Sequence, residues 1–218
     1  MAMKTLVRFL ILLAAIAPLH AQKAPSKAAP DPAPAKQDSA TPKAELVPGL
    51  DCKFFHTLLT ARPEMIVEHD DGHLENIAGE NITEGDLVLI EQTSNCKTNS
   101  QGEHTMRFCD AGMKDKDVEF SIYESGGDYA GVLTVRLKPD RSFTCSYKAN
   151  YVTPPTPREY RFKKQTLRLK SDKLEPRYRL YAWISVEFDE VDLKTGKEFP
   201  IKIEGYIKPV IKSPVAAE

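Results

Sequence analysis

The sequence predicts an all-β fold, an antiparallel β-sandwich, with a closed β-barrel as the alternative. Three observations favour this class. Apolar and polar side chains alternate with a period of two along most of the chain after residue 64. Turn residues separate the alternating runs at intervals of about ten residues, which is typical of sandwiches and barrels. Only one short segment carries helix signals.

The composition is that of an ordinary globular protein. Hydrophobic residues make up 41% of the chain and charged residues 28%. These fractions exclude a collagen-like, a wholly disordered and a multi-span membrane chain. Basic side chains gather between residues 158 and 179, yet the predicted domain as a whole is acidic, so we expect no nucleic-acid partner.

The first 21 residues have the features of a signal peptide. Lys4 and Arg8 supply positive charge, and Ala21 is the small residue that cleavage requires. The apolar run between them is shorter than the ~20 residues that span a bilayer, so we expect no stable membrane span. Residues 22–44, rich in Ala, Pro and Lys, predict a disordered tether. A single β domain, residues 45–218, then remains, and we expect a periplasmic or secreted protein.

The first half of this domain predicts one short helix, a hairpin of two strands and a further short strand. Asp51 is a suitable N-cap for a helix over 52–61, which Pro63 would stop. Asp71-Gly72 predicts a tight turn between two strands of a hairpin. The apolar run 87–90 predicts a further short strand.

The middle of the chain predicts three antiparallel strands. Val118, Phe120 and Ile122 share one face, and so do alternate residues from Gly131 to Leu137. Residues 143–151 continue this alternation after a turn that contains Pro139.

The strand over residues 158–170 changes parity along its length. Tyr160 and Phe162 share one face, whereas Leu167 and Leu169 fall on the other. A β-bulge near residues 163–166 would bring all four onto one side.

The last two strands predict a hairpin with one apolar face. Even-numbered residues from Tyr178 to Phe188 are apolar, and odd-numbered residues from Ile201 to Ile207 match them. An even-length loop around Thr195-Gly196 would place Phe188 opposite Ile203 and Ile184 opposite Ile207.

The opposite face of this hairpin predicts a binding surface. It combines the only tryptophan with tyrosines and charged groups, which sugar rings and protein partners both use. The predicted binding residues are Arg179, Tyr181, Trp183, Glu187, Tyr206 and Lys208. The alternative is that a second sheet, a loop or the tether covers Trp183.

Four cysteines in an exported domain predict two disulfides. Three pairings are possible. We expect Cys96 with Cys109, across a polar loop, and therefore Cys52 with Cys145. No Cys-x-x-Cys motif supports a redox or zinc site.

Two clusters of polar side chains, residues 68–73 and 187–192, could in principle bind a metal or catalyse hydrolysis. Residues 68–73 pack metal-capable side chains around the Asp-Gly turn, where His69 and His73 can converge. Such turns commonly carry polar residues for solubility, so we predict no metal site and no cofactor. Nucleophile elbows, phosphate loops and His-Glu-x-x-His motifs are absent from the sequence, so no catalytic residue is predicted.

Glu187-Phe188-Asp189-Glu190-Val191-Asp192 resembles the Glu-x-Asp-x-x-Glu signature of laminarinase-type β-glucanases. The likeness covers six residues, and Asp192 stands where the signature has Glu. It implies a jelly roll with Glu187 as nucleophile and Asp192 as acid/base.

Three functions follow as hypotheses. The first is a non-catalytic domain that binds a cell-envelope glycan or anionic polymer through the Trp183 face. The second is a periplasmic inhibitor or immunity-type protein that binds a hydrolase, using the loop between Cys96 and Cys109. The third is a small glycan hydrolase. Oligomeric state does not follow from the sequence.

Overall fold

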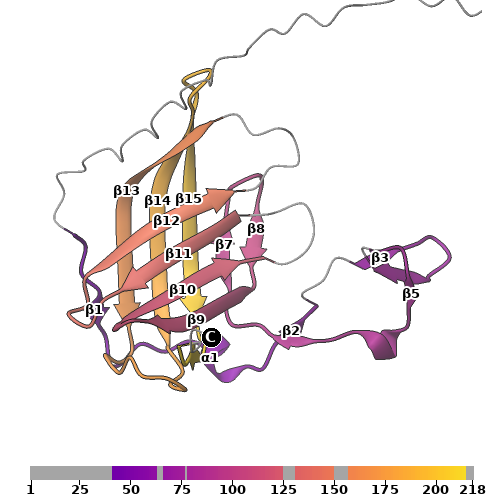
Figure 1. Ribbon diagram of the computed structural model, residues 1–218, viewed down its shortest axis with the longest axis horizontal. Coiled ribbons are helices and arrows are strands. Elements are labelled where there is room, and N and C mark those ends of the chain that lie inside the picture. Colours follow the sequence, from indigo (N-terminus) through magenta and orange to yellow (C-terminus); the bar gives the residue numbers. More distant parts are fainter. Residues whose placement is uncertain (1–40, 63–65, 77, 125–130, 150–156, 215–218) are drawn as a thin grey trace, which may run out of the picture. The chain divides into compact units, whose positions relative to one another are not determined.

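The computed structural model describes residues 41–62, 66–76, 78–124, 131–149 and 157–214 (Figure 1). The predicted signal peptide and the tether up to residue 40 lie outside the described residues, as does Tyr151 at the end of its predicted strand. Within the described ranges, no helix is long and apolar enough to cross a bilayer.

Two main sheets, mostly antiparallel and not closed, form a β-sandwich, which confirms the predicted fold class. One sheet has the order β1 (Glu45–Leu46), β13 (Arg158–Leu169), β14 (Ala182–Asp192), β15 (Glu198–Ile207), β7 (Cys96–Thr98), β8 (His104–Met106). The other has the order β12 (Phe143–Ala149), β11 (Gly131–Leu137), β10 (Asp117–Tyr123), β9 (Phe108–Lys114), β16 (Ile211–Lys212). β1 and β16 pair parallel to their neighbours.

Two smaller sheets lie in the N-terminal part of the chain. β2 (Thr60–Ala61) pairs with β6 (Ile90–Glu91). Between them in sequence, β3 (Ile66–Glu68), β4 (Leu74–Asn76) and β5 (Asn81–Ile82) form a three-stranded ribbon, which confirms the predicted Asp-Gly hairpin. One short helix, α1 (Lys53–His56), and one 3₁₀ turn, η1 (Glu84–Asp86), complete the elements of the described residues.

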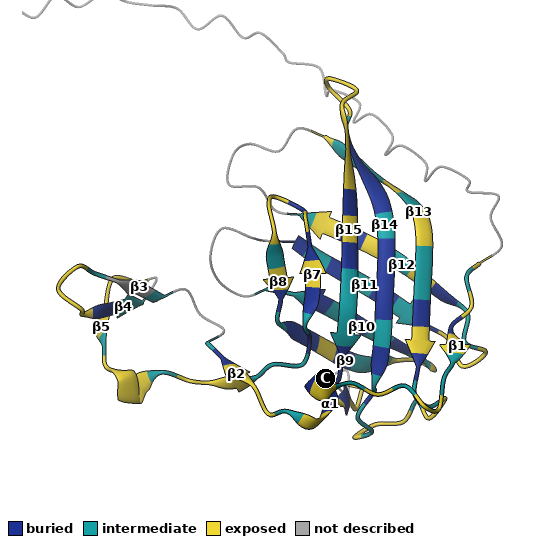
Figure 2. Cartoon of the chain, turned by 180° about the vertical axis from the view of Figure 1, so that it is seen from behind, coloured by how far each residue is buried: buried dark blue, intermediate teal, exposed yellow. Residues whose placement is uncertain are grey.

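The core lies between the two main sheets and is built by alternation. Val118, Phe120 and Ile122 on β10 are fully buried, as are Leu133 and Val135 on β11. β14 departs from this alternation, because Ser185, Asp189 and Glu190 are buried as well, and Figure 2 shows it as a mostly buried strand. Burying each large apolar side chain contributes roughly 1.5–3 kcal/mol, so this alternation fixes which face of each sheet turns inward.

The predicted bulge in β13 is confirmed. The register with β14 shifts between Phe162 and Lys164. Leu167 and Leu169 are buried in the core, and Tyr160 and Phe162 pack against it. One extra residue therefore puts all four side chains on the inner face.

The C-terminal hairpin has the predicted parity but not the predicted pairing. Phe188 lies opposite Ile201, and Ile184 lies opposite Gly205, two residues from the predicted partners. The cause is a tighter loop, because Asp192 Oδ1 accepts hydrogen bonds from the backbone N–H groups of Lys194 (2.9 Å) and Thr195 (3.1 Å). A slip of two residues leaves the inward and outward faces unchanged.

Two predicted elements near the N-terminus are wrong in extent. The helix is a single turn that ends before Thr57, whose backbone is extended, and residues 60–61 form β2 instead. Asp51 makes no cap but bonds through Oδ1 to His56 Nε2 at 2.7 Å. Residues 87–89 form no strand, and Val88 and Leu89 are exposed. A run of four apolar residues therefore did not mark a buried strand here.

The fold begins before the predicted boundary at residue 45. Lys43 bridges to Ser142, and Phe143 donates its backbone N–H to Pro42 O at 2.9 Å. Ala44 is 3% exposed and belongs to the core. Residues 42–44, assigned to the tether from composition, thus belong to the sandwich.

The four cysteines carry free thiols, so the predicted disulfides Cys96–Cys109 and Cys52–Cys145 are absent from the structure. Cys52 precedes α1 on the outer side of the six-stranded sheet, whereas Cys145 packs against the core on the other side. Cys96 and Cys109 are both buried in the core, on strands of different sheets. Burial raises the pKa of Cys96 to about 12 and holds the pKa of Cys109 well above its usual value of 9.0, which keeps both thiols neutral.

Candidate binding face on the six-stranded sheet

The outer face of the six-stranded sheet carries the predicted binding residues that lie on β14 and β15. Register places them in rows across the strands. One row runs Arg168, Trp183, Tyr206, and the next runs Thr166, Ser185, Glu204, Lys97, Thr105. A third runs Lys164, Glu187, Lys202. The structure therefore brings Trp183 and Glu187 onto one surface, as predicted from the period of two.

One part of this face is covered by the segment around α1. The Phe55 ring packs edge-on against Tyr181, with centroids 4.9 Å apart, and against Tyr206 at 5.5 Å. Phe55 itself is 7% exposed. These two tyrosines, predicted to bind a partner, are thus contacts for the chain's own helix.

Arg179 and Lys208 hold the same cover in place. Arg179 donates from Nη1 and Nη2 to the two carboxylate oxygens of Glu91, at 2.7 and 3.1 Å. Lys208 is 2% exposed, donates from Nζ to Thr57 O at 2.7 Å and lies 3.3 Å from Glu91 Oε1. The hydrogen bond from Arg179 lowers the pKa of Glu91, against the effect of burial. Both cations therefore act in the fold, attaching β6 and the α1 segment to the sheet.

Trp183 lies at the edge of the covered part. It is directly opposite Tyr206 on one side and Arg168 on the other. The Arg168 guanidinium carbon stands 4.9 Å from the indole centroid, and Arg168 Nε donates to Glu45 Oε2 at 3.0 Å. Trp183 as a whole is partly buried.

The open part of the face carries lysine and glutamate side chains that lie next to one another. We call this group, Lys164, Ser185, Glu187, Lys202 and Glu204, the polar ladder. Lys202 Nζ lies 2.8 Å from Glu204 Oε2, which also accepts a hydrogen bond from Ser185 Oγ at 3.0 Å. The Lys202 contact lowers the pKa of Glu204, against burial. Glu187 lies directly between Lys164 and Lys202 in the register.

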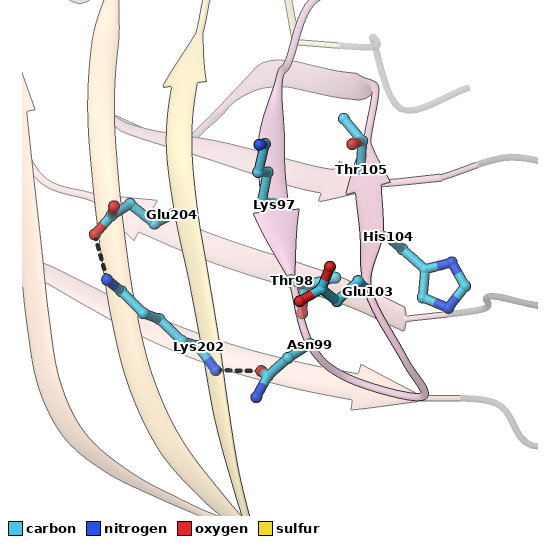
Figure 3. A pocket seen from close by; sticks show the side chains of 8 residues that line it. All are labelled: Lys97, Thr98, Asn99, Glu103, His104, Thr105, Lys202 and Glu204. Atoms are coloured by element: carbon cyan, nitrogen blue, oxygen red, sulfur yellow. Dashed lines mark hydrogen bonds and ion pairs between the residues drawn. The ribbon is translucent and has the colours of Figure 1, made fainter.

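A groove of about 590 Å³ opens beside this ladder, over β15, β7 and β8 (Figure 3). Its lining is polar: Lys97, Thr98, Asn99, Glu103, His104, Thr105, Lys202 and Glu204. Asn99 fixes one wall, because its Oδ1 accepts the backbone N–H of Lys202 (2.8 Å) and its Nδ2 donates to Pro200 O (3.1 Å). The groove is thus a preformed surface of hydrogen-bond donors and acceptors.

The sequence did not single out this groove. Lys202 and Glu204 were visible as outward positions of a strand, but β7 and β8 have only three residues each, too few for a period-two signal. Their position beside β15 depends on long-range pairing of Ile203 with Thr98 and Glu204 with Lys97.

The carboxylates that suggested a hydrolase do not converge. Glu187 and Asp192 lie five residues apart on β14, which places them on opposite faces and about 16 Å apart along the strand. Asp192 caps its own turn, and Asp189 Oδ2 pairs with Lys163 Nζ at 2.6 Å. Several cations of the basic run 158–179 are paired in the same way, as Arg158 contacts Glu190 and Arg161 contacts Glu159.

Comparisons of the chain with protein-family models, curated proteins and solved structures found no match.

Proposed function

We propose that this chain is a non-catalytic binding domain whose ligand is an uncharged glycan of the cell envelope. The groove over β15, β7 and β8 and the adjoining Trp183 carry this proposal. Its lining offers ammonium, amide, hydroxyl and carboxylate groups, which together suit a ligand with many hydroxyls. The partly buried Trp183 provides an apolar group at the border of the polar ladder.

The charge pattern favours an uncharged glycan over an anionic polymer. Arg168 pairs with Glu45, Lys202 pairs with Glu204, and Lys164 faces Glu187. A polyanion would meet a carboxylate beside nearly every cation, so the electrostatic attraction between this face and the polyanion would be weak. A hydroxyl-rich ligand can use both partners of each pair.

A second candidate, an inhibitor that binds a hydrolase, rests on the loop between β7 and β8. Ser100 is fully buried and accepts a hydrogen bond from Tyr147 Oη at 2.9 Å, while Asn99 bonds to β15. These contacts anchor the loop directly before its exposed residues 101–103, and an anchored loop loses less entropy on binding a protein.

Calorimetric titration with neutral hexose and N-acetylhexosamine oligosaccharides tests the proposal. We expect Lys202→Ala and Trp183→Ala to weaken binding roughly tenfold each, because each removes one or two contacts worth about 1 kcal/mol. Lys148→Ala, an exposed lysine on β12 of the other sheet, is the matched control and should bind normally. Equal binding by Lys202→Ala and Lys148→Ala would remove the groove from the proposal. A 1:1 protein complex, lost on changing residues 101–103 while Trp183→Ala is neutral, would favour the inhibitor instead.

A further inference from the structure

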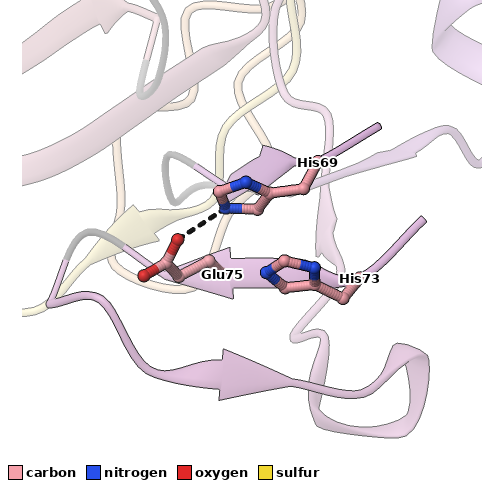
Figure 4. Close-up of side chains that lie close together, drawn as sticks. All are labelled: His69, His73 and Glu75. Carbon is pink, nitrogen blue, oxygen red and sulfur yellow. Dashed lines mark hydrogen bonds and ion pairs between the residues drawn. The ribbon is translucent and has the colours of Figure 1, made fainter. Parts of the chain in front are cut away.

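The turn of the β3–β4 hairpin brings two histidines together. His69 donates its backbone N–H to His73 O at 3.0 Å, and Gly72 donates to His69 O at 2.8 Å. Gly72 adopts a φ of 83°, which this tight turn requires. The two imidazoles therefore face each other across the hairpin, stacked 4.0 Å apart with an interplanar angle of 6° (Figure 4).

Glu75 on β4 joins the two histidines, two residues after His73, which directly precedes this strand. Residues two apart on a strand share a face, so its carboxylate points toward the pair. Glu75 Oε2 lies 2.5 Å from His69 Nε2. Gly79, with a φ of 78°, has no side chain where a Cβ would stand 3.2 Å from Glu75 Oε1, so the following turn leaves room for the carboxylate.

We propose that His69, His73 and Glu75 bind a single Zn²⁺ ion. One ligand atom from each residue lies within 4.8 Å of the others. Two ligands on a tetrahedral zinc, each at ~2.1 Å, are about 3.4 Å apart. The stacked imidazoles must rotate out of their parallel arrangement to direct both nitrogen lone pairs at one ion. Two imidazoles and a carboxylate are a known zinc ligand set, with a fourth position left for water.

Asp71 positions one of these ligands without entering the site. Its Oδ1 lies 2.5 Å from His73 Nδ1 and accepts the backbone N–H of His73 at 3.2 Å. A carboxylate on one imidazole nitrogen fixes the ring orientation and leaves the other nitrogen, Nε2, for the metal. The hairpin thus contains both a ligand set and an outer carboxylate that supports it.

The ligand types select against the common hard cations. Ca²⁺ takes six to eight oxygen ligands and Mg²⁺ prefers octahedral oxygen, neither of which this set offers. Imidazole nitrogen suits zinc and its neighbours in the first transition row.

Calorimetric titration of the full chain with Zn²⁺ tests the site. We expect one ion per chain, no heat with Mg²⁺, and affinity at least roughly tenfold lower in His69→Gln and Glu75→Gln. Asp71→Asn should weaken binding less than either, because it removes support and not a ligand. His56→Gln, a histidine on α1 outside the cluster, is the matched control and should bind as the unchanged chain does.

Two results would overturn the proposal. One is no Zn²⁺ binding by the full chain up to ~1 mM, far above the range of built zinc sites. The other is equal binding by Glu75→Gln, His69→Gln and His56→Gln. Imidazole NMR resonances of the unsubstituted chain guard against misfolded variants: Zn²⁺ should shift those of His69 and His73 and leave that of His104 in place.

Discussion

Lys208 carries its charge where almost no water reaches it, at 2% exposure. Its Nζ is satisfied by Thr57 O and Glu91, and it lies 4.8 Å from the Phe54 ring centroid. A buried ammonium is tolerated only with such partners. This single side chain therefore connects the α1 segment, β6 and β15, and it stabilises the cover over the tyrosines.

Lys208→Ala should lower the free energy of unfolding by about 2 kcal/mol, because it leaves a buried carbonyl and a carboxylate with fewer partners. Urea denaturation monitored by circular dichroism measures the change. Lys148→Ala, an exposed lysine, should shift stability by less than about 0.5 kcal/mol. Equal effects of the two substitutions would show that Lys208 makes no net contribution.

The lowered pKa of Glu91 leads us to predict that the protein becomes less stable in acid. Its folded-state pKa is lowered below the usual 4.5 by the Arg179 hydrogen bond, so the stabilising contribution is complete above pH 4.5 and is lost as pH falls through the folded value. Thermal unfolding measured from pH 7 to pH 3 should show a steeper decline below 4.5 for the unchanged chain than for Glu91→Gln. Parallel curves would contradict this role.

At the scale of elements, Gly205 lets β7 approach β15. A Cβ at this position would stand 2.5 Å from Cys96 Cα and 2.9 Å from Asn95 O, both backbone atoms that cannot move independently. Only a glycine permits this contact, which places Lys97 and Thr98 beside Lys202 and Glu204 in the groove.

Gly205→Ala should destabilise the sandwich by about 3 kcal/mol or prevent folding, since the clash must push β7 away from its neighbour. Gly112→Ala on β9 is the matched control, because its Cβ would meet nothing within 4 Å. We expect that control to be neutral or slightly stabilising. Chemical denaturation compares the two, and similar midpoints would refute the close-approach argument.

At the scale of the whole molecule, the periodicity of the sequence predicted which side chains face the core. It did not predict which residues pair between distant segments. The inward sets on β10, β11 and β14 and the bulge in β13 followed from alternation, because only one parity buries apolar groups. The two-residue slip of the last hairpin did not, since parity allows any even shift.

The candidate sites divide in the same way. The alternation of the sequence places Tyr181 and Tyr206 on the outer face of the sheet. It contains no information that Phe55, far away in the chain, covers them. The convergence of His69 and His73 was visible around their turn, but Glu75 was missed because its role depends on which face of β4 it shares.

We propose that ligand binds on the open part of the six-stranded sheet's outer face. Acetylation rates of individual lysines, measured by mass spectrometry with and without a bound oligosaccharide, test it most directly. We predict that ligand protects Lys97 and Lys202, leaves Lys148 unchanged, and finds Lys208 unreactive in both states. Protection at Lys148 with none at Lys97 and Lys202, while ligand is saturating, would contradict the claim.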